Sequence, residues 1–397
     1  MKRTNVAWPA GNDGLERPRI ALNAHLLSTA ATYRGAGVSH YIHSLLRYLP
    51  EADGRAEYVA LLRRGTAAFE GWACQRARWG TGYPMARIAW EQLAQPWRLW
   101  REGIDLIHAP VYVGPVVSPC LTVVTVHDLS FYLYPELLRR ASRAYLQRMT
   151  RLSVERAAGI IAVSCATRDD LVRLLGVAPE RVTVVHNGVD DVMRPIQDRA
   201  AVAAFRRRRG LPERLILFVG TLEPRKNLPA LLEAYAILRE RWGTAHRLVL
   251  AGGRGWGYAD IEATLARLRL GPEAVLLPGF VPQDELPLWY NAADLFVYPA
   301  IYEGFGIPPL EAMACGVPVI VSDRSSLPEV VGGAGVVVDP DDVEGLARAM
   351  RDVLTDGDRQ RVLRAACLAR ARAFSWRETA RQTASFYHRI LMDGQDG

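Results

Sequence analysis

The sequence contains few cysteines and no long apolar run. Five cysteines are scattered through the 397 residues without a Cys-X-X-Cys pair, which indicates a reducing compartment and argues against structural zinc. The first 19 residues contain charged residues and prolines but no apolar core, so we expect no signal peptide. No apolar run reaches the ~18 residues that a membrane-spanning helix needs. These absences predict a cytoplasmic protein, at most peripheral to the inner face of the membrane.

Positive charge is concentrated in the N-terminal half. The formal net charge is +7, and residues 1–195 carry all of it, with 24 Lys and Arg against 17 Asp and Glu. Six arginines between positions 139 and 156 share a helical pattern that is opposed by Glu155. Anionic lipid headgroups would attract such a surface, whereas no nucleic-acid-binding motif accompanies it. We therefore expect this half to contact an anionic membrane and the chain to bind no nucleic acid; a solvated helix face is the alternative.

Length and strand–helix alternation predict two domains. A chain of 397 residues exceeds the ~250–300 residues at which one core stops growing. Apolar, β-branched runs alternate with helical patterns in two series, from Arg19–Ala24 to Val182–Val185 and from Leu215–Val219 to Gly335–Val338. This alternation predicts two doubly wound α/β domains, whose ligands bind at the carboxyl ends of parallel strands. We expect the linker over Asp191–Leu211.

The segment Tyr298–Gly316 carries two glutamates around a glycine-containing loop. A strand runs into the loop, Glu303 lies on it, and the loop opens a helix that contains Glu311 in its first turns. Unpaired backbone N–H groups and the positive end of the helix dipole bind anions. Carboxylates beside an anion site suit a ligand with both phosphates and hydroxyls, such as a nucleotide sugar. The alternative is structural, with Glu303 as a helix cap and Glu311 as a favourable charge near a helix N-terminus.

A second loop, Gly220–Leu228, follows an apolar strand and carries two adjacent cations. Arg225 and Lys226 precede Asn227, which we expect to cap the next helix. A forked guanidinium beside a compact ammonium suits two neighbouring phosphates. Because the pair follows a strand, it lies where a doubly wound domain places its ligand.

The N-terminal half offers a glycine loop and a histidine. Gly35 and Gly37 precede a predicted helix, where glycine lets backbone N–H groups approach a phosphate or sugar; a plain turn explains them equally well. His127 and Asp128 end an apolar strand. The imidazole could hydrogen-bond a substrate hydroxyl while Asp128 orients the ring or caps a helix. A structural histidine is the alternative.

Three other patterns have structural explanations. Gly252–Gly257 resembles a dinucleotide fingerprint but lacks the expected acid at a following strand end, so we expect a turn beside the ligand. Asp339–Asp341 enters a helix and fits capping better than metal binding. The histidines show no metal-ligand spacing. Four apolar residues fall on one helical face, which is typical of a core-facing helix: Trp90, Leu93, Trp97 and Trp100.

These motifs resemble those of the retaining glycosyltransferases of family 4, the glycosyl transferases of group 1, which have the GT-B fold. The paired glutamates with seven intervening residues match at Glu303 and Glu311. The loop Gly220–Asn227 is similar to the diphosphate-binding loop of the family, Gly35–Gly37 to its N-domain glycine loop, and His127 to its acceptor-side histidine.

The resemblance implies two Rossmann-like domains facing each other across a cleft. We expect a disordered extension over residues 1–17, an acceptor-binding domain over 18–195 and a nucleotide-sugar-binding domain over 196–376, with a helix at about 377–394 packing back on the first domain. The implied reaction moves a hexose, mannose or glucose, from a GDP- or UDP-sugar to a glycan or lipid-linked acceptor in cell-surface polysaccharide synthesis. The alternatives are a nucleotide-sugar epimerase of the same fold and a non-catalytic binding subunit.

The resemblance also implies roles for individual residues. No cofactor and no metal are expected, because a basic pair and a helix N-terminus can balance the charge of a diphosphate. The implied catalytic residues are His127, Glu303, Arg225 and Lys226. The implied donor-binding residues are Gly35, Gly37, Gly220, Arg225, Lys226, Val281, Glu303, Gly304, Phe305, Gly306, Ile307 and Glu311.

Overall fold

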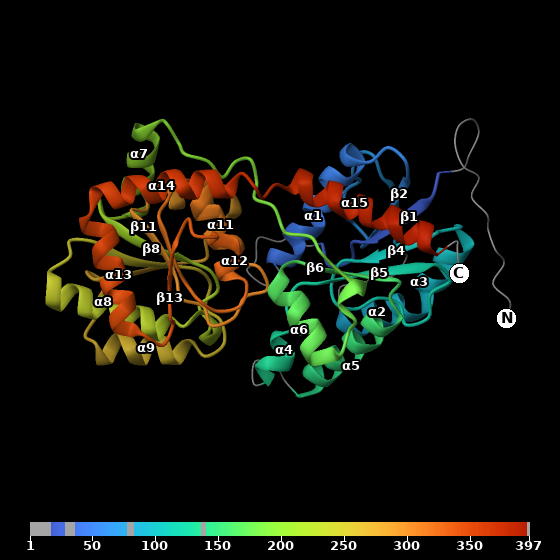
Figure 1. The fold of residues 1–397 in the computed structure, drawn as a ribbon, viewed down its shortest axis with the longest axis horizontal. Coiled ribbons are helices and arrows are strands. Elements are labelled where there is room, and N and C mark those ends of the chain that lie inside the picture. The colour runs from blue at the N-terminus through green and yellow to red at the C-terminus, as the bar shows by residue number, and fades with distance from the viewer. Residues whose placement is uncertain (1–16, 28–35, 78–82, 136–139, 395–397) are drawn as a thin grey trace. The chain divides into compact units, whose positions relative to one another are not determined.

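The computed structural model describes residues 17–27, 36–77, 83–135 and 140–394, so the extension expected over residues 1–17 lies almost wholly outside the described part of the chain. The chain forms two compact units (Figure 1). The first unit holds the described residues up to Gly188 and the C-terminal helix that begins at Trp376. The second unit holds Val189–Ser375.

A seven-stranded parallel sheet forms the centre of the first unit, in the order β3-β2-β1-β4-β5-β6-β7. Its central strands are buried on both faces, which explains why they read as unbroken apolar runs. The strands are β1 (Arg19–Asn23), β2 (Glu57–Leu62), β3 (Ala73–Arg76), β4 (Leu106–Ala109), β5 (Leu121–Val126), β6 (Gly159–Ala162) and β7 (Val182–Val184).

Helices cover this sheet, and the C-terminal helix α15 packs along α1. A π-helical turn, Trp90–Ala94, joins α2 to α3 in one helical segment. The helices of the unit are α1 (Ala36–Ala52), α2 (Pro84–Ala89), α3 (Gln95–Arg101), α4 (Ser130–Leu133), α5 (Arg140–Arg156), α6 (Cys165–Leu175) and α15 (Trp376–Asp393).

The second unit repeats this plan with six parallel strands in the order β10-β9-β8-β11-β12-β13. These are β8 (Leu215–Val219), β9 (Arg247–Ala251), β10 (Val275–Gly279), β11 (Leu295–Tyr298), β12 (Val319–Ser322) and β13 (Val336–Val338). The helices are α7 (Arg199–Arg209), α8 (Leu228–Trp242), α9 (Tyr258–Arg267), α10 (Leu286–Asn291), α11 (Ile307–Ala314), α12 (Leu327–Val331), α13 (Val343–Thr355) and α14 (Gly357–Ala371).

Both sheets confirm the predicted doubly wound α/β architecture. In each, the strand order reverses beside the first strand, between β1 and β4 and between β8 and β11. Ligands of such sheets bind outside the carboxyl ends of the strands at this reversal. The fold therefore singles out the loops after β8 and β11 in the second unit.

The junction between the units differs from the predicted one. The first unit ends at Gly188, before the expected boundary at 195, because the following segment is held by the second unit. Asn291 of α10 accepts a hydrogen bond from the backbone N–H of Ile196 (2.7 Å) and donates one to the carbonyl of Arg194 (3.0 Å). The expected linker also contains a helix, α7, which is capped by Asp198 and buries Phe205.

The expectation of a core-facing face on the Trp90–Trp100 helix is wrong for most of its residues. Trp90 is buried, but Leu93, Trp97 and Trp100 are exposed. The π-helical turn shifts the helical phase, so that Gln95 and Leu99 face inward.

Candidate functional site

The two loops at the strand reversal of the second unit are joined to each other. The loop after β8 contains the short 3₁₀ turn Pro224–Lys226, and the loop after β11 contains Glu303. The backbone N–H of Ile301 donates to the carbonyl of Arg225 at 2.9 Å. The structure thus brings together the basic pair and the loop glutamate that were identified in separate parts of the sequence.

Lys226, Glu303 and Tyr298 form a buried polar cluster between these loops. The Lys226 ammonium contacts Glu303 Oε1 and donates to the Tyr298 hydroxyl at 2.9 Å. The Tyr298 hydroxyl donates to the same carboxylate oxygen at 3.0 Å. Lys226 is 6% exposed and Glu303 9% exposed. Both contacts fall on Oε1, and no described residue donates to Oε2.

The cluster keeps Glu303 ionised. Burial alone would raise the pKa of this carboxyl, but the charges of Lys226 and Arg225 and its two hydrogen bonds outweigh burial and hold the pKa below its usual value. Burial lowers the pKa of Lys226 in spite of the neighbouring carboxylate. Burial, followed by the charge of Glu303, raises the pKa of Tyr298 well above 10, so the phenol keeps its proton.

Arg225 is paired with a carboxylate of its own. Its Nε and Nη2 donate to Glu223 Oε1 at 3.2 and 3.1 Å, and both side chains are largely buried. Each cation of the pair is therefore held in place by one glutamate. An arriving diphosphate would bring further negative charge to two preorganised cations in a site of low dielectric, where Coulomb interactions are stronger than in water.

Serines after β12 fix the backbone of the Glu303 loop. The Ser326 hydroxyl lies 2.9 Å from the carbonyl of Glu303 and 2.8 Å from that of Phe305, which share its one proton, and the Ser325 hydroxyl donates to the carbonyl of Glu303 (2.6 Å). Gly306 then opens α11 with φ +99°, and a Cβ there would lie 2.7 Å from Leu327 Cδ2. Glycine is required at this point, both for its backbone angle and for space.

The remaining predicted donor-binding residues of this unit lie at the same edge of the sheet. Glu311, on α11, is buried and accepts a hydrogen bond from the Tyr290 hydroxyl at 2.7 Å. Gly220 follows β8, and Val281 is buried in the loop after β10. Gly304, Phe305 and Ile307 belong to the serine-held loop and the start of α11.

The glycine-rich segment Gly252–Gly257 lies against the basic loop. A Cβ on Gly252 would come within 1.8 Å of the Gly220 carbonyl oxygen, so the two backbones touch where only glycine fits. Leu222 and Arg254 form an isolated parallel bridge. The segment therefore supports the loop that carries the cations.

In the first unit His127 follows β5, as the sequence indicates. Its Nε2 donates to the carbonyl of Pro110 at 2.8 Å, and the edge of its ring meets Tyr41 of α1 at a centroid distance of 4.8 Å. Burial lowers the pKa of His127, so the imidazole is neutral near pH 7. Asp128 accepts hydrogen bonds from the backbone N–H (3.0 Å) and hydroxyl (2.7 Å) of Ser130, at the start of α4. Asp128 thus precedes Leu129, the N-cap residue of α4, and holds the first residue of that helix.

Behind His127 lies a buried hydrogen-bonded chain that the sequence did not reveal. The Thr125 hydroxyl pairs with the Tyr41 hydroxyl (3.1 Å) and with His108 Nε2 (2.7 Å), and His108 Nδ1 pairs with the Tyr387 hydroxyl (2.5 Å). Tyr387 comes from α15, so the C-terminal helix completes the support of this strand end.

The structure says less about Gly35 and Gly37, the two glycines that the sequence predicts to bind the donor. Gly37 lies exposed in the first turn of α1, with open space around it. Gly35 lies outside the described residues. No contact of Gly37 distinguishes a ligand loop from a plain helix start.

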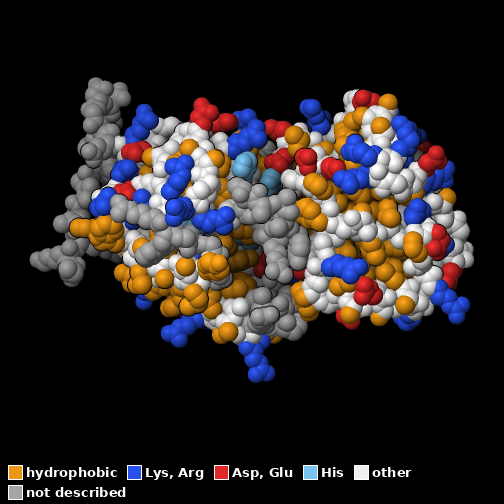
Figure 2. Space-filling view, turned by 180° about the vertical axis from the view of Figure 1, so that it is seen from behind, with side chains coloured by type: hydrophobic (Ala, Val, Ile, Leu, Met, Phe, Trp, Pro, Cys, Tyr) orange, Lys and Arg blue, Asp and Glu red, His pale blue; other side chains and the backbone are white. Residues whose placement is uncertain are grey.

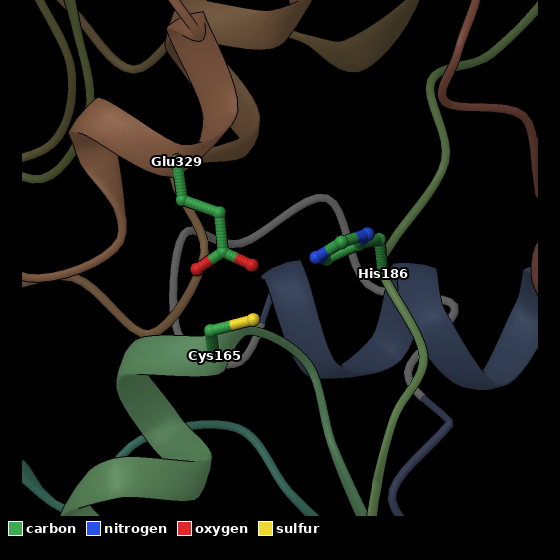
Figure 3. Close-up of side chains that lie close together, drawn as sticks. All are labelled: Cys165, His186 and Glu329. Atoms are coloured by element: carbon green, nitrogen blue, oxygen red, sulfur yellow. The ribbon is translucent and has the colours of Figure 1, made fainter.

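Cys165 and His186 lie close together in the first unit (Figure 3). The thiol at the start of α6 and a ring nitrogen of His186, which follows β7, lie within 4.8 Å of each other. Figure 3 also draws Glu329, which belongs to α12 of the second unit. A closed zinc site takes four ligands, and the described residues of the first unit supply two here. This pair alone is no metal centre.

Sequence reasoning missed Tyr298, Tyr290 and Ser326, which hold the two glutamates and their loop. One signal was available for Lys226 itself. The chain has lysine at positions 2 and 226 and uses arginine for every other cation. A lysine kept in such a background indicates that the position needs a compact ammonium group.

Two family models match the chain. The model described as "Glycosyl transferases group 1" matches residues 203–370, and the model described as "Glycosyltransferase Family 4" matches residues 35–192. O-antigen chain mannosyltransferase B of Escherichia coli is 35% identical over 294 residues, which cover 74% of this chain and 76% of that protein.

The serotype-specific mannosyltransferase WbdA of Escherichia coli is 32% identical over 287 residues. The match covers 70% of this chain but 34% of WbdA, so the chain spans about a third of that longer protein.

Solved structures share the fold over nearly the whole chain. Sucrose-phosphate synthase from Thermosynechococcus elongatus has a TM-score of 0.75 at 23% identity, covering 95% of this chain and 100% of that one. Anabaena HepE in complex with UDP and glucose has a TM-score of 0.71 at 19% identity, covering 94% and 100%. These matches show the GT-B fold. In the part of the chain that the structure describes, no helix has the length and apolar character needed to span a bilayer.

Proposed function

We propose that this chain, which belongs to family 4 of the glycosyltransferases, transfers mannose from a nucleoside diphosphate sugar to a glycan or lipid-linked acceptor, with retention of configuration. The acceptor would be a growing cell-surface polysaccharide. Mannose is favoured because the similar proteins of Escherichia coli carry the name mannosyltransferase. Glucose is the second candidate, because the similar HepE structure holds UDP and glucose.

The buried cluster of Lys226, Glu303 and Tyr298 at the strand reversal is the observation that carries the proposal. A buried ion pair is not needed to stabilise this fold, because an apolar replacement is often neutral or stabilising. Two cations and two carboxylates gathered at one ligand-binding edge instead suit a ligand that carries both phosphates and sugar hydroxyls.

The proposed chemistry depends on charge that develops on the leaving group. As the bond between the anomeric carbon and the phosphate breaks, the diphosphate gains negative charge. Lys226 and Arg225 would then bind the transition state more tightly than the ground state. Each cation would contribute about 3 kcal/mol, by analogy with the loss of one oxyanion donor. The backbone N–H groups at the start of α11 would add to this, since a helix N-terminus attracts anions.

The glutamates would hold the hydroxyls of the donor. Glu303 has one carboxylate oxygen, Oε2, that no described residue engages, and it would accept from a hydroxyl of the transferred sugar. Glu311 would accept from the ribose. His127, with Nε2 committed to Pro110, would present its neutral Nδ1 as an acceptor to a hydroxyl of the sugar or the acceptor.

A lipid-linked acceptor would require the enzyme to work at a membrane surface. We expect the first unit to make that contact, because the excess positive charge of the chain lies in its N-terminal half. No cofactor is required by this scheme, and a divalent ion is expected to be dispensable, since Arg225 and Lys226 supply the positive charge.

Transfer is tested by incubating the purified chain with GDP-mannose or UDP-glucose, each with and without a mannose-terminated oligosaccharide. The proposal predicts elongated oligosaccharide and released nucleoside diphosphate with GDP-mannose, and little donor turnover when acceptor is absent. Conversion of the donor sugar without acceptor would instead identify an epimerase. Failure to turn over either donor with any offered acceptor would support a binding subunit.

A further inference from the structure

The first unit presents an unusually apolar surface on the helical segment Pro84–Arg101. Leu93 is 74% exposed, Trp97 56% and Trp100 69%, and Met85 is exposed as well. We name these four residues the aromatic stripe. Figure 2 shows hydrophobic side chains gathered on the surface of the first unit, with Lys and Arg side chains around them. Contiguous exposed apolar patches are uncommon on soluble proteins and mark interaction surfaces.

The residues of the aromatic stripe lie on the outer side of the helical segment Pro84–Arg101. Leu93, Trp97 and Trp100 are separated by four and three residues, Met85 lies in α2 before the π-helical turn, and all four side chains are exposed. The opposite side is well packed. Trp90 and Leu99 are buried, and the Trp90 ring lies 3.8 Å from the ring of His25. The segment therefore has a buried inner face and an outer face whose large apolar side chains are exposed.

The charges on and around the stripe are positive. The Arg101 guanidinium lies 5.2 Å from the centre of the Trp97 ring, next to the outer face. Glu91, the one acid of the segment, is buried, and Glu102, the residue after its end, pairs with Arg98 at 3.1 Å. Among the described residues of this segment, no acidic side chain is exposed.

The arginine-rich helix α5 adjoins the same surface. Gln92, on the π-helical turn, accepts a hydrogen bond from the backbone N–H of Val116 at 2.9 Å, and Arg156 of α5 donates to the carbonyl of Val116 at 2.8 Å. Val117, the next residue, is 71% exposed. The aromatic stripe is thus linked through one loop to the helix that carries Arg140, Arg143, Arg148 and Arg151.

This combination fits a lipid surface better than a second copy of the chain. Tryptophan at the headgroup level and arginine around it are the residues that anchor proteins at a bilayer interface. In a symmetric dimer the same patch of both copies would meet, which would bring two arginine-rich flanks together. An anionic bilayer offers apolar tails to the stripe and negative headgroups to the arginines.

We propose that the chain lies on anionic membranes through the aromatic stripe, with α5 as its electrostatic flank. This inference deepens the proposed function, since it names the surface by which the enzyme would reach a lipid-linked acceptor. Its test needs no nucleotide sugar, so it can fail while transfer to a water-soluble oligosaccharide succeeds, and the reverse.

The full chain is floated with vesicles of phosphatidylethanolamine and phosphatidylglycerol, and with vesicles of phosphatidylcholine alone. The test variant is Trp97→Gln with Trp100→Gln. Both side chains are exposed, so the fold should be unaffected. The control is Val362→Gln on α14, which removes an equally exposed apolar side chain (69%) from the second unit. We expect binding of the wild type and the control to anionic vesicles, and binding at least tenfold weaker for the double variant.

Three further readouts make the result decisive. Tryptophan fluorescence should shift to the blue when the wild type meets anionic vesicles, and transfer to a water-soluble oligosaccharide should be unchanged in the double variant. Equal vesicle binding by wild type and double variant, or no binding by the wild type, would overturn the proposal. Sedimentation of the wild type as a dimer without lipid, and of the double variant as a monomer, would overturn it in favour of self-association.

Discussion

The two units share the same order over six strands, with β7 as an additional edge strand in the first, and yet carry opposite kinds of polar groups at their strand ends. In the second unit the reversal between β8 and β11 gathers ionised side chains, Lys226 and Glu303. In the first unit the end of β5 carries the neutral imidazole of His127, backed by hydroxyls and the neutral His108. The doubly wound fold supplies the place for a ligand, whereas the side chains decide its chemistry.

The titratable side chains at both strand ends are buried, and whether they are charged depends on the groups that contact them. At the second unit, Lys226 and Glu303 are buried in contact with each other, and the charges of Lys226 and Arg225 help to hold the pKa of Glu303 below its usual value. At the first unit, no carboxylate of the described residues pairs with His108, so burial lowers its pKa to about 3 and the ring stays uncharged. A charged pair can recognise a diphosphate, while a neutral imidazole can exchange hydrogen bonds with sugar hydroxyls.

The largest expected effect comes from removing the buried ammonium. Lys226→Ala should lower kcat/KM by roughly 100- to 1,000-fold, the size seen when one oxyanion donor is lost. The change also leaves Glu303 buried without its partner, which costs about 3–5 kcal/mol of folding stability. Transfer kinetics and thermal melting measure the two effects.

A double variant separates the effect of Lys226 on transfer from its effect on folding stability. Lys226→Met with Glu303→Gln removes both charges, so it should recover most of the melting temperature while transfer stays low. A single Lys226→Ala variant with more than a tenth of wild-type kcat/KM would contradict the role of this lysine.

A smaller loss is expected at the second cation. Arg225→Ala should lower kcat/KM at least tenfold, with little effect on folding, because Arg225 and Glu223 are less deeply buried than Lys226. The matched control is Arg241→Ala, which breaks an exposed pair with Glu344 at the far end of α8. Equal activity of Arg225→Ala and the control in a nucleotide-release assay would refute the phosphate role.

Substitution of His127, at the neutral strand end of the first unit, should affect transfer without affecting nucleotide binding, unlike substitution of Lys226 or Arg225. His127→Ala should lower transfer roughly tenfold, because one hydrogen bond contributes up to about 1.5 kcal/mol, while the affinity for nucleoside diphosphate stays unchanged. His246→Ala serves as control, since His246 precedes β9 at the opposite edge of its sheet. Weaker nucleotide binding by His127→Ala, measured by calorimetry, would show that the two strand ends do not divide the work in this way.

The neutral histidines should also make the fold sensitive to acid. Because the pKa of His108 is about 3 in the folded chain and 6.5 in the unfolded one, the unfolded state binds the extra proton below pH 6.5. The free energy of unfolding should therefore fall as the pH drops from 6.5, by up to about 1.4 kcal/mol per pH unit from this group. Urea unfolding at several pH values should give a shallower slope for His108→Gln. Identical slopes for the wild type and His108→Gln would exclude His108 as a source of the acid sensitivity.

The smallest expected effect on the transfer rate is that of removing divalent metal ions. If Arg225 and Lys226 supply the charge that a divalent ion would otherwise supply, excess EDTA should leave the transfer rate unchanged. Rates are compared with EDTA and with added magnesium. Abolition of transfer by EDTA and its return with magnesium would show that the cationic strand end does not suffice.

The sequence predicted the fold and the composition of the second site because both depend on local patterns. Strand–helix alternation indicated two doubly wound domains, and loops that follow strands pointed to Arg225 and Glu303. What remained hidden depends on contacts between distant segments. Tyr298 reads as the last residue of an apolar strand, and only its proximity to Lys226 makes it part of the cluster.

The sequence-based expectations that the structure contradicts also have local causes. The segment Asp191–Leu211 was expected to be a linker, but Phe205 packs its ring edge against Trp289 and fixes α7 on the second unit. Asn227 adopts a left-handed conformation before α8, and its side chain donates to the carbonyl of Pro340 instead of capping the helix. A regular helical repeat suggested a core role for Trp97, which the π-helical turn prevents.

The most direct test of the account is a structure of the enzyme with nucleoside diphosphate or an unreactive donor analogue. We predict the phosphates in hydrogen-bonding contact with Arg225 and Lys226 and with the backbone N–H groups of residues 304–307. Phosphates bound elsewhere, with Lys226 still paired to Glu303 and Arg225 to Glu223, would contradict it.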